Sequence, residues 1–107
     1  MKKYVKIDTP ENFDMTYIFD LKSKMSNFPY EQKYSIIFDF KKTKFLSSLG
    51  VGVLLYLNAR TKKNNGEMRL INVNETIMNT FHLLGADQEV TISESEEIPA
   101  GWEEVIF

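Results

Sequence analysis

The chain has 107 residues, of which 43% are hydrophobic and 26% are charged, and this composition is that of one ordinary globular domain. Because there is no cysteine, disulfide scaffolds, zinc fingers and thiol nucleophiles are excluded. A net charge of -2 argues against the phosphate backbone of nucleic acid as the main ligand. No apolar run approaches the roughly 20 residues that span a bilayer, and the basic start lacks the apolar region of a signal peptide. We therefore expect no membrane insertion and a cytoplasmic location.

The first forty residues predict a strand, a helix and a second strand. Residues 4–7 alternate in polarity, as a short strand does. A threonine, Pro10 and an acidic residue then form a helix-start pattern, so a helix is expected to begin near Pro10. Apolar residues follow it at helical spacing: Phe13, Tyr17, Leu21, Met25 and Phe28. The apolar run 34–40 is rich in strand formers and predicts a buried strand.

The second half of the chain continues the same alternation. A helix is expected to begin near Ser48 and to end at the Asn-Asn-Gly sequence 64–66. Residues 68–73 predict a strand, a third helix follows the capping residue Asn74, and residues 90–92 predict a last strand. The order β-α-β-α-β-α-β predicts a single α/β domain over residues 1–107. Its sheet should be mainly parallel, with four to five strands and helical crossovers.

The tail, residues 93–107, differs in character from the rest of the chain. It begins with an acidic stretch and ends in an apolar set: Trp102, Val105, Ile106 and Phe107. Apolar termini are usually tied down on their own domain, and an exposed one marks a partner-binding segment. The sequence leaves both alternatives open.

The stretch FLSSLGVGVLL, residues 45–55, carries the strongest functional signal. Ser47 and Ser48 fall in the loop after a strand's carboxyl end, where this fold class usually places function. One of them is expected to be the N-cap of the following helix. A phosphoryl group here would also meet free N–H groups and the positive end of that helix. Gly50 and Gly52 each cost about 1 kcal/mol relative to alanine inside a helix, which indicates the close approach of a partner or a neighbouring strand.

Residues 35–92 resemble the STAS domain of bacterial anti-sigma-factor antagonists. The resemblance covers an apolar strand that ends in an acid, the Ser-Ser-Leu-Gly-Val-Gly motif, and the Asn-Gly-Glu sequence before the next strand. It implies that Ser48 falls on the serine that these antagonists have phosphorylated. Ser47 stands where the family has an acid, and Leu49 stands where it has a small residue.

The resemblance also implies the site residues. Ser48 is the first candidate for phosphorylation and Ser47 the second. The partner-binding residues are expected to be Ser47, Ser48, Leu49, Gly50 and Gly52. Asp39, which falls on the acid ending the preceding strand, is expected to hold the serine loop through its backbone N–H groups; the alternative is an ordinary solvated acid at a strand end. We expect no metal, no cofactor and no catalytic residue.

The expected function is that of a regulatory interaction domain without enzymatic activity. Its partners would be a serine protein kinase that acts as an anti-sigma factor and, for the reverse step, a serine phosphatase. The alternative is a constitutive, non-phosphorylated STAS scaffold in a complex or a transporter system, which Ser47 and Leu49 favour. A small α/β enzyme is disfavoured, because His82 is the only histidine and no glycine-rich nucleotide motif is present.

Overall fold

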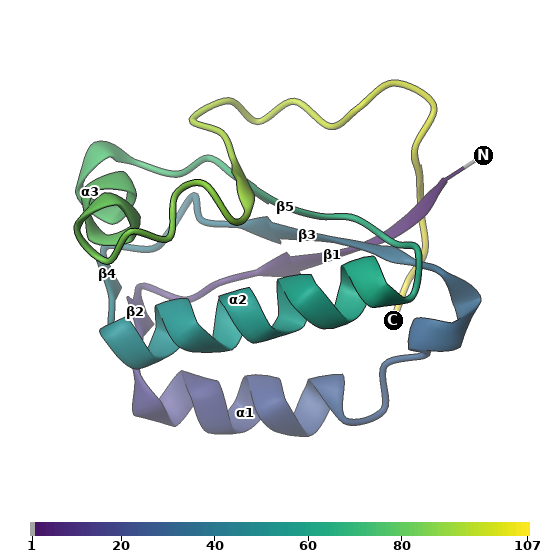
Figure 1. The fold of residues 1–107 in the computed structure, drawn as a ribbon, viewed down its shortest axis with the longest axis horizontal. Helices are drawn as coiled ribbons and strands as arrows, with labels where there is room; N and C mark the ends of the chain where they lie inside the picture. The colour runs from purple at the N-terminus through teal and green to yellow at the C-terminus, as the bar shows by residue number, and fades with distance from the viewer. Residues whose placement is uncertain (1) are drawn as a thin grey trace.

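Five parallel strands form the central sheet of the computed structural model, which describes residues 2–107 (Figure 1). In spatial order they are β6 (Thr91–Ile92), β5 (Met68–Ile71), β3 (Ser35–Asp39), β1 (Lys3–Asp8) and β7 (Glu103–Glu104). The helices are α1 (Met15–Met25), α2 (Ser48–Lys63) and α3 (Glu75–Leu83), with a 3-10 turn at Tyr30–Gln32. A second, two-stranded parallel sheet pairs β2 (Asn12–Phe13) with β4 (Phe45–Leu46). The predicted α/β fold with a parallel sheet is therefore confirmed.

The central strand β3 is buried on both faces, as its continuous apolar sequence predicts. Ile36 and Phe38 point into the main core, while Ile37 belongs to a smaller cluster on the opposite face. Helices α1 and α2 lie side by side on one face of the sheet (Figure 1). The main core lies between these helices and the strands.

Helix α1 begins later than the sequence predicts. Its N-cap is Asp14, whose side chain accepts from the Thr16 N–H, so the predicted start near Pro10 is wrong. Tertiary contacts recruit the preceding segment instead: the Thr9 N–H donates to the Asp39 carbonyl at 3.0 Å, and Phe13 lies in β2. Long-range pairing therefore overrides a local helix-start signal.

The starts and ends of α2 and α3 follow local sequence more closely. Asn74 caps α3 as predicted, and Gly85 ends it with a φ of 67°. After α2, Asn65 takes the left-handed conformation with a φ of 65°. Gly66 is needed for a different reason, because a Cβ there would collide with the Tyr34 carbonyl oxygen.

The apolar tail docks on the domain. The Glu103 N–H donates to the Lys2 carbonyl at 2.9 Å and the Val105 N–H to the Tyr4 carbonyl at 2.7 Å, which makes β7 an additional edge strand beside β1. The Trp102 ring packs 6.0 Å from the Tyr4 ring. Phe107 is 43% exposed but its ring lies 5.3 Å from the Phe28 ring, whereas Ile106 is 88% exposed.

We expect Trp102→Ala to destabilise the domain by roughly 1–2 kcal/mol, because Trp102 is half-buried rather than fully buried. The melting temperature should fall by about 4 °C or more per kcal/mol. Ile106→Ala, in the same tail, is the matched control and should leave the melting temperature within error. Equal melting temperatures for the two variants would show that the tail is not docked.

Candidate functional site

The loop that carries the two serines is fixed at its start by β4. The Ser47 N–H donates to the Phe13 carbonyl at 3.0 Å, which continues the pairing of β2 with β4. The Ser47 hydroxyl then accepts from the Gly50 N–H at 3.0 Å, and its carbonyl accepts from the Val51 N–H. Ser47 is therefore the N-cap of α2.

Ser48 is the first residue of α2 and is exposed. Within residues 2–107 the Ser48 hydroxyl has no hydrogen-bond partner. The side-chain cap of α2 is supplied by Ser47 instead. It lies at the positive end of a 16-residue helix. Its neighbour Leu49 has 49% of its surface exposed. A change at this hydroxyl would therefore remove no hydrogen bond that the structure of residues 2–107 contains.

The two glycines of the motif have different roles. Gly50 is buried, and a Cβ there would lie 2.8 Å from Leu46 Cδ1 and 2.9 Å from Phe13 Cδ1. Its close approach is to β2 and β4 of its own domain, so the prediction that Gly50 is partner-facing needs correction. Gly52 is exposed, and a Cβ there would have no atom within 4 Å. Of the two, only Gly52 faces outward.

Asp39 ties together three segments at the carboxyl ends of the strands. Its carboxylate accepts from the Lys41 N–H at 2.9 Å and from Asn72 Nδ2 at 2.9 Å, and it lies 3.3 Å from Lys6 Nζ. The expected backbone support is therefore at Lys41, at the start of the loop, and does not reach Ser47 or Ser48. The sequence placed Asp39 correctly at the strand end, but the predicted hydrogen bonds to the backbone near the serines are not made; the bond is to the Lys41 N–H.

Burial alone would raise the pKa of the Asp39 carboxyl. The hydrogen bonds from Asn72 and from the Lys41 N–H, together with the Lys6 ammonium, outweigh burial and hold this pKa below its ordinary value. The charged form of Asp39 is thus the one that the folded domain stabilises.

A groove of about 710 Å³ runs between α1 and α2 and begins beside the serine motif. Leu49 and Gly52, two of the predicted partner-binding residues, line it. Sequence reasoning missed the α1 side, where Met15 and Phe19 are 57% and 71% exposed. The signal was present, because Met15 and Phe19 lie off the predicted apolar face of this helix, but the groove also requires α2 beside α1, and residue spacing does not reveal that pairing.

Other chemistry is sparse in the described part of the chain. No group of three histidine, aspartate or glutamate residues in residues 2–107 could hold a metal ion. His82 lies on the exposed face of α3, with Nδ1 3.1 Å from Asp87 Oδ2. None of the helices in residues 2–107 combines the length and apolar character needed to cross a bilayer.

The parallel sheet, the serine loop capped by Ser47 and the flanking groove define an α/β domain with an exposed helix start beside a groove. The family model described as "STAS domain" matches residues 9–97, and the chain therefore belongs to the STAS family. A STAS domain is a regulatory or interaction domain. A comparison with curated proteins gives no match.

The two glycines give a matched pair of predictions. Gly50→Ala should destabilise the domain by roughly 1–2 kcal/mol, because the overpacking cost exceeds the gain in helix propensity. Gly52→Ala should stabilise it by up to about 1 kcal/mol, since the new methyl group meets open space. Urea unfolding of both variants measures the difference. A similar effect of the two substitutions would contradict the placement of α2.

Asp39→Asn should destabilise the domain near neutral pH by roughly 1–3 kcal/mol, because charge-assisted hydrogen bonds are lost. The folded pKa of Asp39 is lower than the unfolded one, so its contribution is present above about pH 4 and is lost as the pH falls through the folded pKa. Denaturant unfolding across pH should show the gap between wild type and variant closing on the acid side. A gap that stays constant at every pH would refute the stabilised carboxylate.

Proposed function

We propose that this STAS domain is a regulator of the anti-sigma-factor-antagonist kind, which binds a serine kinase that acts as an anti-sigma factor. The observation that carries the proposal is the state of Ser48: exposed, unbonded within residues 2–107, and first in α2. Exposed Leu49 and Gly52 lie beside it on the same helix. The domain would be a substrate of the kinase and would perform no catalysis itself.

The switch would be phosphorylation of Ser48. Its hydroxyl oxygen would attack the γ-phosphorus of the ATP bound to the kinase, lose its proton to a base of the kinase, and release ADP. The product carries about 1.5 to 2 negative charges at neutral pH. A serine phosphatase would restore the hydroxyl by hydrolysis, with release of inorganic phosphate.

The added charge would act on binding rather than on folding. The N-terminus of α2 favours a negative group through its dipole and its N–H groups. In an interface, the same charge would have to be desolvated without a matching cation, which weakens the complex. Ser47 caps α2 and Ser48 does not, so phosphorylation of Ser48 would leave the cap in place. This supports a switch of this kind.

The second candidate function is a constitutive STAS scaffold in a complex or a transporter system. Leu49 favours it, because a half-exposed apolar side chain directly after Ser48 extends a fixed contact surface. In this case Ser48 would stay unmodified, and the partner would bind irrespective of a kinase.

Ser48 substitutions separate the two functions. We expect Ser48→Asp and Ser48→Ala both to leave the melting temperature nearly unchanged, since neither removes the cap. Under the switch, Ser48→Asp should weaken the partner complex by about tenfold or more, while Ser48→Ala keeps wild-type affinity. The partner is to be identified by co-purification from the native cell with intact-mass analysis, and affinities are measured by calorimetry.

Ser47→Ala is the control for folding and should cost about 1 kcal/mol of stability through loss of the cap. Equal affinity of the Ser48→Asp and Ser48→Ala variants for the partner would eliminate the switch and leave the scaffold function.

A further inference from the structure

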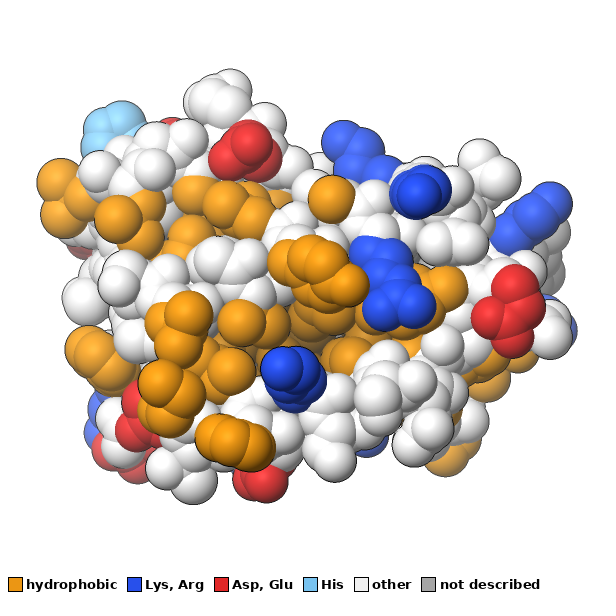
Figure 2. All heavy atoms as spheres, turned by 60° about the horizontal axis from the view of Figure 1, so that its bottom comes forward, with side chains coloured by type: hydrophobic (Ala, Val, Ile, Leu, Met, Phe, Trp, Pro, Cys, Tyr) orange, Lys and Arg blue, Asp and Glu red, His pale blue; other side chains and the backbone are white. Residues whose placement is uncertain are grey.

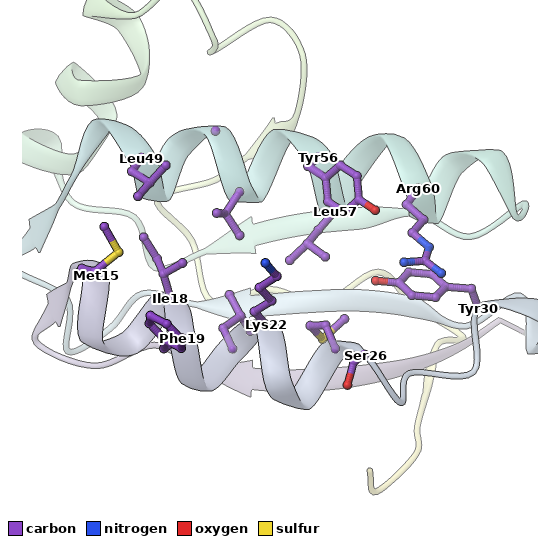
Figure 3. A pocket seen from close by; sticks show the side chains of 14 residues that line it. Met15, Ile18, Phe19, Lys22, Ser26, Tyr30, Leu49, Tyr56, Leu57 and Arg60 are labelled. Carbon is purple, nitrogen blue, oxygen red and sulfur yellow. The ribbon is translucent and has the colours of Figure 1, made fainter.

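The groove between α1 and α2 is lined mainly by apolar side chains, and large exposed side chains flank it. Its floor includes the buried residues Leu21 and Leu57. Phe19 on α1 and Tyr56 on α2 stand on its two sides, with 71% and 61% of their surfaces exposed (Figure 3). Figure 2 shows hydrophobic side chains gathered over this face of the domain, with lysine and arginine side chains among them. A concave, mostly apolar surface with a few polar groups in its lining is the form that binding sites usually take.

One half of the groove is cationic. Arg60 lies at the end of the groove beside Tyr30, and Lys22 lies nearer its middle (Figure 3); we call this half the cationic end. Within residues 2–107, no aspartate or glutamate lines the groove. In the described chain, residues 2–107, neither cation forms an ion pair with a carboxylate of the domain. The Arg60 guanidinium instead lies 4.2 Å from the centre of the Tyr30 ring. The positive charge at this end is thus not paired with any carboxylate of the described residues.

The Tyr30 hydroxyl is a further polar group of the groove that has no hydrogen-bond partner in the described part of the chain. Tyr30 is only 5% exposed, and its hydroxyl is buried with no hydrogen-bond partner in residues 2–107. Figure 3 shows this oxygen directed towards the groove, beneath Arg60. A buried hydroxyl normally finds a partner. An acceptor supplied from outside, after Arg60 swings aside, would satisfy it.

We propose that this groove binds an amphipathic α-helix of a partner protein, whose carboxylates face Lys22, Arg60 and the Tyr30 hydroxyl at the cationic end. The sides of the groove favour a helix over a single acyl chain, because a thin chain on the floor would leave Phe19 and Tyr56 uncovered. Along α2, Leu49 and Arg60 lie roughly 16 Å apart at about 1.5 Å per residue. That length takes about three turns of a docked helix, the usual span of helix-in-groove recognition.

This inference depends on the proposed function in one respect only: it assumes that the ligand is a protein. The groove is continuous with the serine motif through Leu49 and Gly52. Ser48 and Arg60 are about 18 Å apart along α2, which exceeds the Debye length of about 8 Å in physiological salt. A charge at Ser48 would therefore leave the cationic end of the groove intact, so the two proposals can fail separately.

The test uses a displayed library of helical peptides about 14 residues long, with every position on one face randomised, selected on the intact chain. We expect the binders to carry apolar residues at i, i+3/i+4 and i+7, with aspartate or glutamate concentrated at one end. By fluorescence anisotropy, Arg60→Glu and Lys22→Glu should each weaken the best peptide by about tenfold or more. Lys42→Glu makes the same change of charge in the exposed loop before β4, towards the other end of α2, and should weaken the peptide less than about twofold. Thermal melts verify that each variant is folded.

Several results would overturn the proposal. Selected peptides without acidic enrichment, or an equal effect of Arg60→Glu and Lys42→Glu, would show that the groove does not recognise acidic residues. Dodecanoate that competes with the peptides would point to a lipid site, and a dimer in analytical ultracentrifugation that Arg60→Glu dissociates would assign the groove to a second copy. Ser48→Asp should retain peptide binding, so a failure of the serine switch with the kinase is not mistaken for a failure of the groove.

Discussion

The close packing of the first turn of α2 against β2 and β4 is the constraint on which the rest of the structure depends. Gly50 lacks a side chain where Leu46 and Phe13 pack, and this lets the first turn of α2 approach β2 and β4 closely. The same turn is held by the Ser47 N–H on the Phe13 carbonyl and by the Ser47 cap. With its start and its rotation fixed in this way, the helix has one face for the core and one face for solvent. Because of this packing, Ser48 lies on the face of α2 that is exposed to solvent.

This arrangement separates stability from recognition along one helix. Val51, Leu54 and Leu57 are buried in the main core, while Leu49 and Tyr56 are exposed beside the groove. A chemical change on the outer face therefore alters charge and shape with little effect on the free energy of unfolding. Under the proposed switch the domain would bind, release and bind again, and such a division would keep the released state folded.

Much of the fold could be predicted because its signals are local. The apolar run that forms β3, the cap at Asn74 and the serine start of α2 each depend on neighbours in sequence. The start of α1 could not be predicted, because Thr9 bonds to Asp39 across 30 positions. The site divides in the same way: Ser48 was recognisable from its motif, whereas Gly50 and Gly52 look alike in sequence and differ only in what faces them. The groove depends on the pairing of α1 with α2, which no local pattern encodes.

An alanine scan of α2 by denaturant unfolding tests the central claim. The claim is that one face of this helix packs in the core and the opposite face is exposed and contributes little to stability. The account predicts losses of roughly 2–5 kcal/mol for Leu54→Ala and Leu57→Ala, as for other buried leucines. It predicts changes within about 0.5 kcal/mol at Ser48, Leu49 and Tyr56, as for surface positions without a structural role. Losses at Leu49 or Tyr56 as large as that at Leu54 would mean that the outer face is packed against the domain, and would contradict the account.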